Sequence, residues 1–322
     1  MTEINNTNIN DIDLNDPKLF EKKIADESSS EHIAAPKYSY WGSVWRNFFH
    51  NKLAIALLAV VVIVFLFAFI QPIFSGYDTM NTPNINNRNL HYLRPFQNPD
   101  FFLGSDDKGN SLWDALWAGT KNSLFLAVMA TFITEFLGVV VGMFWGFSKK
   151  IDAVMIEVYN VVSNIPTTLI AMILVYALGG GMQQLIFALC ITTWVGTAYF
   201  IRVQVMIIRD REYNLASKCL GTPTYKIILN NILPYLVSVI ITSVSRDIPL
   251  FISTEVALSY MGVGLSYKYP SLGKMIQEYS PYMTSAGYLF WIPVVTAAVI
   301  SISLYIVGQS LADASDPRTH ML

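Results

Sequence analysis

The side chains that could do chemistry in this sequence are charged residues inside otherwise apolar stretches. They are Glu135, Glu157, Arg246, Asp247 and Glu255. Their spacing forms no recognisable catalytic pair, and the sequence has no G-x-x-x-x-G-K-[ST] phosphate loop, no H-E-x-x-H and no G-x-S-x-G. Charges in such stretches often mark ion or substrate paths. The pattern therefore favours transport over covalent chemistry and predicts no catalytic residue.

Two interpretations of the central charges stay open. Arg246 and Asp247 lie in the middle of an apolar stretch, where a charge costs about 2.5–3.5 kcal/mol unless it faces a partner or water. They either line a translocation path or form an interhelical pair that braces the bundle, with Glu135 or Glu157. Glu255 lies near the end of the same stretch. It either belongs to the path, where it would brace the outer gate, or is a structural acid held by hydrogen bonds.

A polar hairpin is the one long charged interruption in the second half of the chain, from Arg209 to Pro234. Its first part has helical periodicity, carried by Glu212, Leu215, Ala216 and Cys219. Gly221 is expected to end this helix, with Thr222 as N-cap and Pro223 as first residue of a second. An L-shaped hairpin between two spans has a free face, so we expect it to dock on another protein.

The composition is that of a polytopic membrane protein. Of 322 residues, 53% are hydrophobic and 14% charged, and the mean hydropathy is +0.42. The net charge of −2 argues against a nucleic-acid partner. Cys190 lies in an apolar run and Cys219 in the hairpin, and the four histidines lie in polar stretches. The sequence therefore predicts no disulfide framework, no metal site and no cofactor.

Apolar runs predict an all-α membrane protein with six transmembrane helices. The expected spans are Leu53–Phe74, Asn122–Phe147, Ile151–Leu178, Gln184–Ile208, Ile227–Met261 and Gly287–Gly308. We expect Pro166 to kink the third span, and breaks near Pro234 and Pro249 in the fifth.

The remaining segments complete the domain organisation. Residues 1–36 are polar and predict a disordered tail. Residues 37–52 predict an amphipathic interfacial helix, residues 75–121 an extracellular loop, and residues 311–322 a second tail. Residues 122–310 are expected to form a five-helix core that includes the hairpin, at 209–226. The bias of Lys and Arg predicts that the hairpin and both termini lie in the cytoplasm.

The hairpin resembles the permease loop of ABC importers, whose signature is E-A-A, a Gly, and L-P about a dozen residues later. Here Glu212–Gly221 reads E-Y-N-L-A-S-K-C-L-G, and Leu233-Pro234 follows. Other stretches are similar to the C-type permease subunit of oligopeptide and dipeptide importers. They are Leu103–Gly109, Glu255–Gly264, Pro270–Gly273 and Asp316–Arg318.

This resemblance implies an importer permease of type I fold that carries oligopeptides. Its partners would be a homologous second permease, two cytosolic ATPase subunits, and an extracellular lipoprotein or periplasmic binding protein. Glu212 would pair with a basic residue of the ATPase groove, and Gly221 would supply the bend. Close packing would come from Tyr213, Ala216 and Ser217. The alternatives are a dipeptide or nickel importer of the same branch and, in a different class, a secondary transporter.

Overall fold

The computed structural model describes residues 40–315. The tail expected over residues 1–36 and the matched Asp316–Arg318 lie outside the described residues. The chain divides after Tyr40 into two units, and the helices below pack within the second.

The regular structure of the described segment is helical throughout. Five of the helices are long and apolar enough to cross a membrane: α2 (Lys52–Ser75), α3 (Leu112–Phe147), α6 (Met182–Arg209), α9 (Leu233–Tyr260) and α11 (Gly287–Ser315). Helix α9 is preceded without a break by α8 (Thr224–Ile227) and a π-helical turn. A further apolar pair, α4 (Lys149–Ser163) and α5 (Thr167–Leu178), is bent by 76° at its break and makes a sixth span if the pair is counted as one. The predicted fold class is confirmed.

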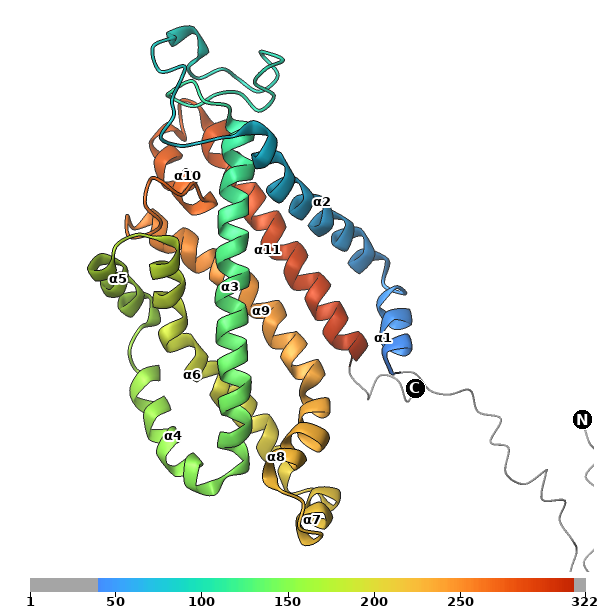
Figure 1. The fold of residues 1–322 in the computed structure, drawn as a ribbon. Helices are drawn as coiled ribbons and strands as arrows, with labels where there is room; N and C mark the ends of the chain where they lie inside the picture. Colours follow the sequence, from blue (N-terminus) through green and yellow to red (C-terminus); the bar gives the residue numbers. More distant parts are fainter. Residues whose placement is uncertain (1–39, 316–322) are drawn as a thin grey trace, which may run out of the picture. The chain divides into compact units, whose positions relative to one another are not determined.

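Short helices lie at the two ends of this bundle. They are α1 (Tyr40–Phe48), α7 (Glu212–Cys219), α8 (Thr224–Ile227) and α10 (Leu272–Tyr279), with a π-helical turn at Ile228–Ile232 and 3-10 turns at Arg88–Leu90 and Ser280–Tyr282. Figure 1 shows α7 and α8 at one end, and α10 with the loop between α2 and α3 at the other.

Helix α3 lies next to α2, α6 and α9 and is the centre of the bundle (Figure 1). It packs on α6 through Gly138, Gly142 and Gly146, which share one face at four-residue spacing. A Cβ at Gly138 would lie 2.6 Å from Thr197, and one at Gly146 would lie 2.7 Å from the carbonyl oxygen of Arg202. Small residues at this spacing let two membrane helices approach closely. The contact therefore depends on the absence of side chains.

Several helix boundaries differ from those expected. Helix α3 begins at Leu112 rather than at Asn122, because the Ser111 hydroxyl caps it by accepting a hydrogen bond from the Asp114 N–H. Helix α11 continues past Gly308 to Ser315. The third span is interrupted after Ser163, close to the kink expected at Pro166.

The expected breaks in the fifth span are wrong. Pro249 lies inside the continuous helix α9, and Pro234 lies in its first turn, where a missing N–H costs little. Instead of a break, the backbone widens into the π-helical turn just before α9. The hydrogen-bonded rod from Thr224 to Tyr260 is 37 residues long.

Helix α1 covers part of the segment predicted as an interfacial helix, residues 37–52. Val44 and Phe48 are buried, whereas Trp41, Trp45 and Phe49 are about half exposed. The rings of Trp45 and Phe49 stack at 5.9 Å between centroids. An exposed aromatic face next to a transmembrane helix suits a position in the membrane interface.

Candidate functional site

The exposed face of helix α7 is the centre of the candidate site. Glu212 is its first residue, where a carboxylate is favoured by the helix dipole. The side chains of Tyr213 and Leu215 are 46% and 45% exposed, and Ala216 is exposed as well. Apolar groups left in water beside a carboxylate form a surface suited to a protein partner.

Glu212 has no ion-pair partner within residues 40–315. Arg209, which could have paired with it, turns the other way. Its Nε contacts Asp210 Oδ2 at 3.0 Å and its Nη1 donates to the carbonyl oxygen of Gly146 at 2.9 Å. The Arg209 side chain therefore ties the end of α6 to α3 and leaves Glu212 available.

The bend after α7 is closed by backbone hydrogen bonds around Gly221, whose φ is +78°. The Gly221 N–H donates to the Lys218 carbonyl and the Thr222 N–H to the Ser217 carbonyl, both at 3.0 Å. This pair of bonds is a Schellman motif, which requires the left-handed conformation that glycine adopts at least cost. The predicted roles of Thr222 as N-cap and of Pro223 as first helical residue are wrong, because the second helix begins one residue later than expected. Helix α8 begins at Thr224, with Pro223 as its N-cap.

A polar cluster under α7 holds the hairpin to the bundle. Asn214 is fully buried; its Nδ2 donates to the Ile208 carbonyl at 2.8 Å, and its Oδ1 accepts from Asn231 Nδ2 at 3.0 Å. Ser217 shares in this cluster, since its hydroxyl donates to the Tyr213 carbonyl at 2.9 Å and lies 3.4 Å from Asn231 Nδ2. Sequence reasoning missed both asparagines, because their burial and their mutual hydrogen bond appear only in the folded chain.

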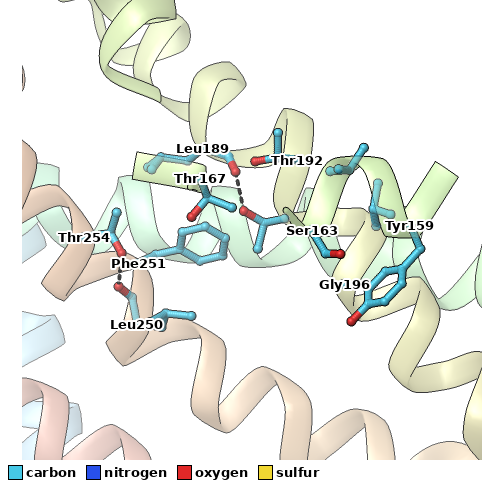
Figure 2. A pocket seen from close by; sticks show the side chains of 12 residues that line it. Tyr159, Ser163, Thr167, Leu189, Thr192, Gly196, Leu250, Phe251 and Thr254 are labelled. Carbon is cyan, nitrogen blue, oxygen red and sulfur yellow. Dashed lines mark hydrogen bonds between the residues drawn. The ribbon is translucent and has the colours of Figure 1, made fainter. Parts of the chain in front are cut away.

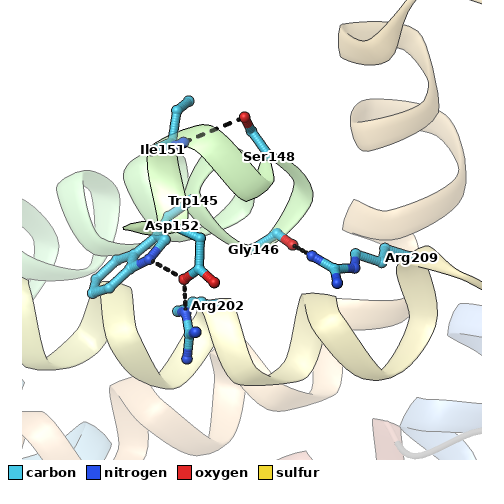
Figure 3. A network of polar contacts seen from close by, with 7 residues as sticks. All are labelled: Trp145, Gly146, Ser148, Ile151, Asp152, Arg202 and Arg209. Carbon is cyan, nitrogen blue, oxygen red and sulfur yellow. Dashed lines mark hydrogen bonds and ion pairs between the residues drawn. The ribbon is translucent and has the colours of Figure 1, made fainter. Parts of the chain in front are cut away.

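A second polar network joins α3, α4 and α6 at the same end of the bundle (Figure 3). Asp152 Oδ1 accepts from Arg202 Nε at 2.5 Å and from Trp145 Nε1 at 2.8 Å. The guanidinium group of Arg202 also lies over the rings of Trp145 and Tyr199, at 5.6 and 5.4 Å from their centroids. The side chains of Arg202 and Asp152 are 13% and 24% exposed, so water screens this ion pair only in part.

Arg246 and Asp247 pair with each other in α9. Arg246 Nε lies 3.2 Å from Asp247 Oδ1; the arginine side chain is 55% exposed and the aspartate side chain 3%. The guanidinium group lies 5.7 Å from the centre of the Phe200 ring. Neither residue forms an ion pair with Glu135 or Glu157 within the described segment, but the Asp247 side chain interacts with Glu135 on α3, which supports bracing between α3 and α9. Of the two side chains, only that of Arg246 is exposed, so a place on the predicted path stays a prediction for Arg246 alone.

This difference in exposure gives a testable expectation for the pair. Arg246→Ala should lower substrate uptake with little loss of thermal stability, because its side chain is half exposed. Asp247→Ala should instead lower thermal stability by about 1–3 kcal/mol, because it removes a buried hydrogen-bonded group. Uptake assays and thermal unfolding of the two variants check this. Equal behaviour of the variants in both assays would contradict the assignment.

Glu255 lies at the junction of α3, α9 and α10 and is fully buried. Its carboxyl accepts from the hydroxyls of Ser123 at 3.0 Å, Ser259 at 2.8 Å and Ser271 at 2.7 Å. The Leu272 N–H in turn donates to Ser123 Oγ at 3.1 Å. This arrangement favours the structural interpretation of Glu255 over a place on the path.

The loop Leu103–Gly109 is organised by Asp106, which is 4% exposed. Its carboxylate accepts from the backbone N–H groups of Lys108 at 2.9 Å and Asn110 at 2.7 Å. Burial raises the pKa of the Asp106 carboxyl, and these hydrogen bonds oppose the rise. Gly104 and Gly109 have φ of +87° and +73°, which explains why this loop has glycine at both positions.

Two family models match this chain. A family model described as "binding-protein-dependent transport system inner membrane component" matches residues 138–321, and one described as "N-terminal TM domain of oligopeptide transport permease C" matches residues 39–95. The chain is 49% identical to the oligopeptide transport system permease protein AmiD of Streptococcus pneumoniae, over 92% of this chain and 95% of the relative.

Two relatives from Bacillus subtilis are more distant. Identity is 32% to the dipeptide transport system permease protein DppC, over 90% of this chain and 89% of the relative. It is 30% to the oligopeptide transport system permease protein OppC, over 92% of this chain and 96% of the relative.

Proposed function

We propose that this chain, which belongs to the family of binding-protein-dependent transport inner membrane components, forms half of the translocation pathway of an ATP-driven importer for oligopeptides. The chain is a permease subunit and not an enzyme. Membership in this family removes the secondary-transporter alternative. The proposed coupling to an ATPase rests on one observation: helix α7 has an exposed face, and the chain bends at Gly221 directly after it.

The oligopeptide assignment is supported by the names of the relatives. AmiD and the Bacillus OppC are described as oligopeptide permeases, and the first has the higher identity to this chain, 49% against 32% for the dipeptide permease DppC. A dipeptide importer is therefore the second candidate.

A component of a binding-protein-dependent system works with partner subunits. The proposed partners are a homologous second permease, two cytosolic ATPase subunits, and an extracellular lipoprotein or periplasmic binding protein. The proposed orientation in the bacterial plasma membrane has α7 and both termini in the cytoplasm and α10 on the outer side, as the distribution of Lys and Arg favours.

The hairpin is connected to the bundle in a way that would transmit movement. An ATPase that pulls on α7 also pulls on α9 through Asn214 and Asn231, and on α3 through Arg209. Helix α4 follows α6 because Asp152 and Arg202 join them. Closure of the two ATPases would thereby rock the bundle between inward-open and outward-open states, which are two states biased by ligand binding elsewhere.

The proposal is tested with the complete complex in proteoliposomes. The permease pair is co-purified with the ATPases, loaded with the binding protein, and assayed for ATP-dependent uptake of labelled peptides of two to eight residues. Glu212→Lys should weaken co-purification of the ATPases, whereas Glu157→Lys on the exposed side of α4 should not. If the complex takes up none of these peptides in the presence of ATP, the proposal is overturned.

The Asp152–Arg202 pair is expected to contribute to coupling. Asp152→Asn removes the charge but keeps an acceptor for Trp145, and should cost about 1–2 kcal/mol of stability. Peptide uptake per ATP hydrolysed should fall, because α4 no longer follows α6 fully. Simultaneous measurement of uptake and hydrolysis checks this, with Lys149→Gln, an exposed charge on the same helix, as control. An unchanged ratio for Asp152→Asn would contradict the coupling role.

A further inference from the structure

A cavity of about 360 Å³ lies where the broken helix pair α4–α5 faces α6 and α9 (Figure 2). The short connection between α4 and α5 runs past it, from Asn164 to Pro166. At membrane depth, backbone outside a helix is tolerated only where it is buried in protein or lines a polar or water-filled space. The connection at this 76° bend is exposed in the single chain, so it is expected to face the cavity or a partner subunit rather than lipid.

The cavity wall combines hydroxyl groups with apolar side chains. The hydroxyls come from Tyr159, Ser163, Thr167, Thr192, Thr193 and Thr254. The other six lining residues, among them Leu250 and Phe251, are uncharged and apolar. An ionised group that entered would lose part of its hydration without gaining a counter-charge, which is costly. The wall is suited to an uncharged guest.

The hydrogen-bonding state of these hydroxyls fits a guest with amide groups. The hydroxyls of Thr193 and Thr254 donate to the carbonyls of Leu189 and Leu250, at 2.6 and 2.8 Å, and keep lone pairs for an incoming N–H. The Thr192 hydroxyl oxygen is buried and has no hydrogen-bond partner in the described part of the chain. A buried hydroxyl without a partner is unfavourable, so a guest that bonds to it would be stabilised.

The cavity is also connected to the network that we link to coupling. The ring of Tyr159, in the cavity wall, stacks on that of Tyr199 with 4.0 Å between centroids. The guanidinium group of Arg202, the ion-pair partner of Asp152, lies over the Tyr199 ring. Movement of α4 against α6 would therefore change the cavity.

We propose that this cavity is a resting site for an uncharged, mostly apolar side chain of a peptide in transit, together with its adjoining backbone amide. This inference rests on the proposed function and adds which peptide side chains the site prefers, namely uncharged ones. Its volume lies at the small end of the roughly 300–1,000 Å³ of small-molecule sites. It therefore takes one part of an oligopeptide at a time, and peptides rich in Lys or Glu pass less readily.

Gly196 allows the cavity to be filled without damage to the fold. It lines the cavity in α6, and a Cβ added there would meet no atom within 4 Å. Gly196→Ala should transport as the wild type does. Gly196→Leu should lower uptake of peptides with large apolar side chains about tenfold or more, the factor that ~1.4 kcal/mol corresponds to, and should affect glycine- and alanine-only peptides less.

The matched control is Gly287→Leu at the start of α11, where an added Cβ would have only an ordinary 3.7 Å contact with Trp291. It should leave uptake of all these peptides unchanged. Thr192→Asp should raise uptake of lysine-containing peptides relative to neutral ones, because it supplies the missing counter-charge. Thr296→Asp, on α11 outside the cavity, should not produce this shift.

The assays use the complete complex in proteoliposomes, as above. If the wild type imports no peptide, the proposed function itself fails. If the wild type imports peptides and Gly196→Leu imports all of them equally well, only the resting site is overturned. For the case in which Gly196→Leu does not assemble, Gly196→Cys is labelled with a thiol reagent in a Cys219→Ala background. Neutral peptide should slow the labelling severalfold; labelling that lipid slows and peptide does not would overturn the proposal in favour of an acyl chain.

Discussion

Replacing Gly221 by valine should abolish ATP-coupled uptake while the protein still reaches the membrane. The glycine has a φ of +78°, in the left-handed region that costs an L-residue about 1–2 kcal/mol, and more when it is β-branched. The Schellman bonds at this bend fix the direction in which α7 leaves the bundle. Without them, the surface of Glu212, Tyr213 and Ala216 would no longer meet the ATPase in a defined orientation.

Gly221→Asn is the matched control for this prediction. Asparagine tolerates the left-handed conformation far better than valine does, and no atom lies within 4 Å of a Cβ at this position. Gly221→Asn should therefore retain most of the uptake. The measurement is uptake together with co-purification of the ATPases from membranes that contain equal amounts of each variant. Wild-type uptake by Gly221→Val would show that this bend does not carry coupling.

Replacing Glu255 by alanine should be the most destabilising single change at the opposite end of the bundle. The substitution removes the common acceptor of three serine hydroxyls and leaves a void in a fully buried site. Each polar group left without a partner costs about 1–3 kcal/mol, so we expect a loss on the order of 3 kcal/mol or more. Helix α10, which Ser271 and Leu272 hold to α3 and α9, should detach first.

Glu255→Gln is the appropriate comparison because it keeps the shape and one acceptor oxygen. It should be destabilised much less than Glu255→Ala. Thermal unfolding in detergent measures the difference, and protease sensitivity of the segment around α10 reports the local detachment. If Glu255→Ala kept wild-type stability but lost uptake, a direct role of this carboxyl on the path would replace the structural one.

The agreement between sequence and structure is best where the relevant forces are local. The hairpin was predictable because the φ of Gly221 and the restraint from Pro223 depend on their own backbone. The spans were predictable because the length of an apolar run sets whether a helix can cross a membrane. The start of α3 at Leu112 was missed because a single capping serine extended the helix into a segment too polar to read as a span.

The roles of the charged residues depended on neighbours far away in the chain. Ser123 is 132 positions from Glu255, and Arg202 is 50 from Asp152, so no local pattern could show that the first acid is enclosed by hydroxyls and the second by a cation. The same reason hid Asn214 and Asn231 under the hairpin. Local composition predicted a polytopic membrane protein with a bent polar hairpin, and the resemblance of its motifs added the permease assignment. Packing alone decided which of its polar groups are held inside and which, like Glu212 and Arg246, stay available, because burial depends on what the folded chain places against each side chain.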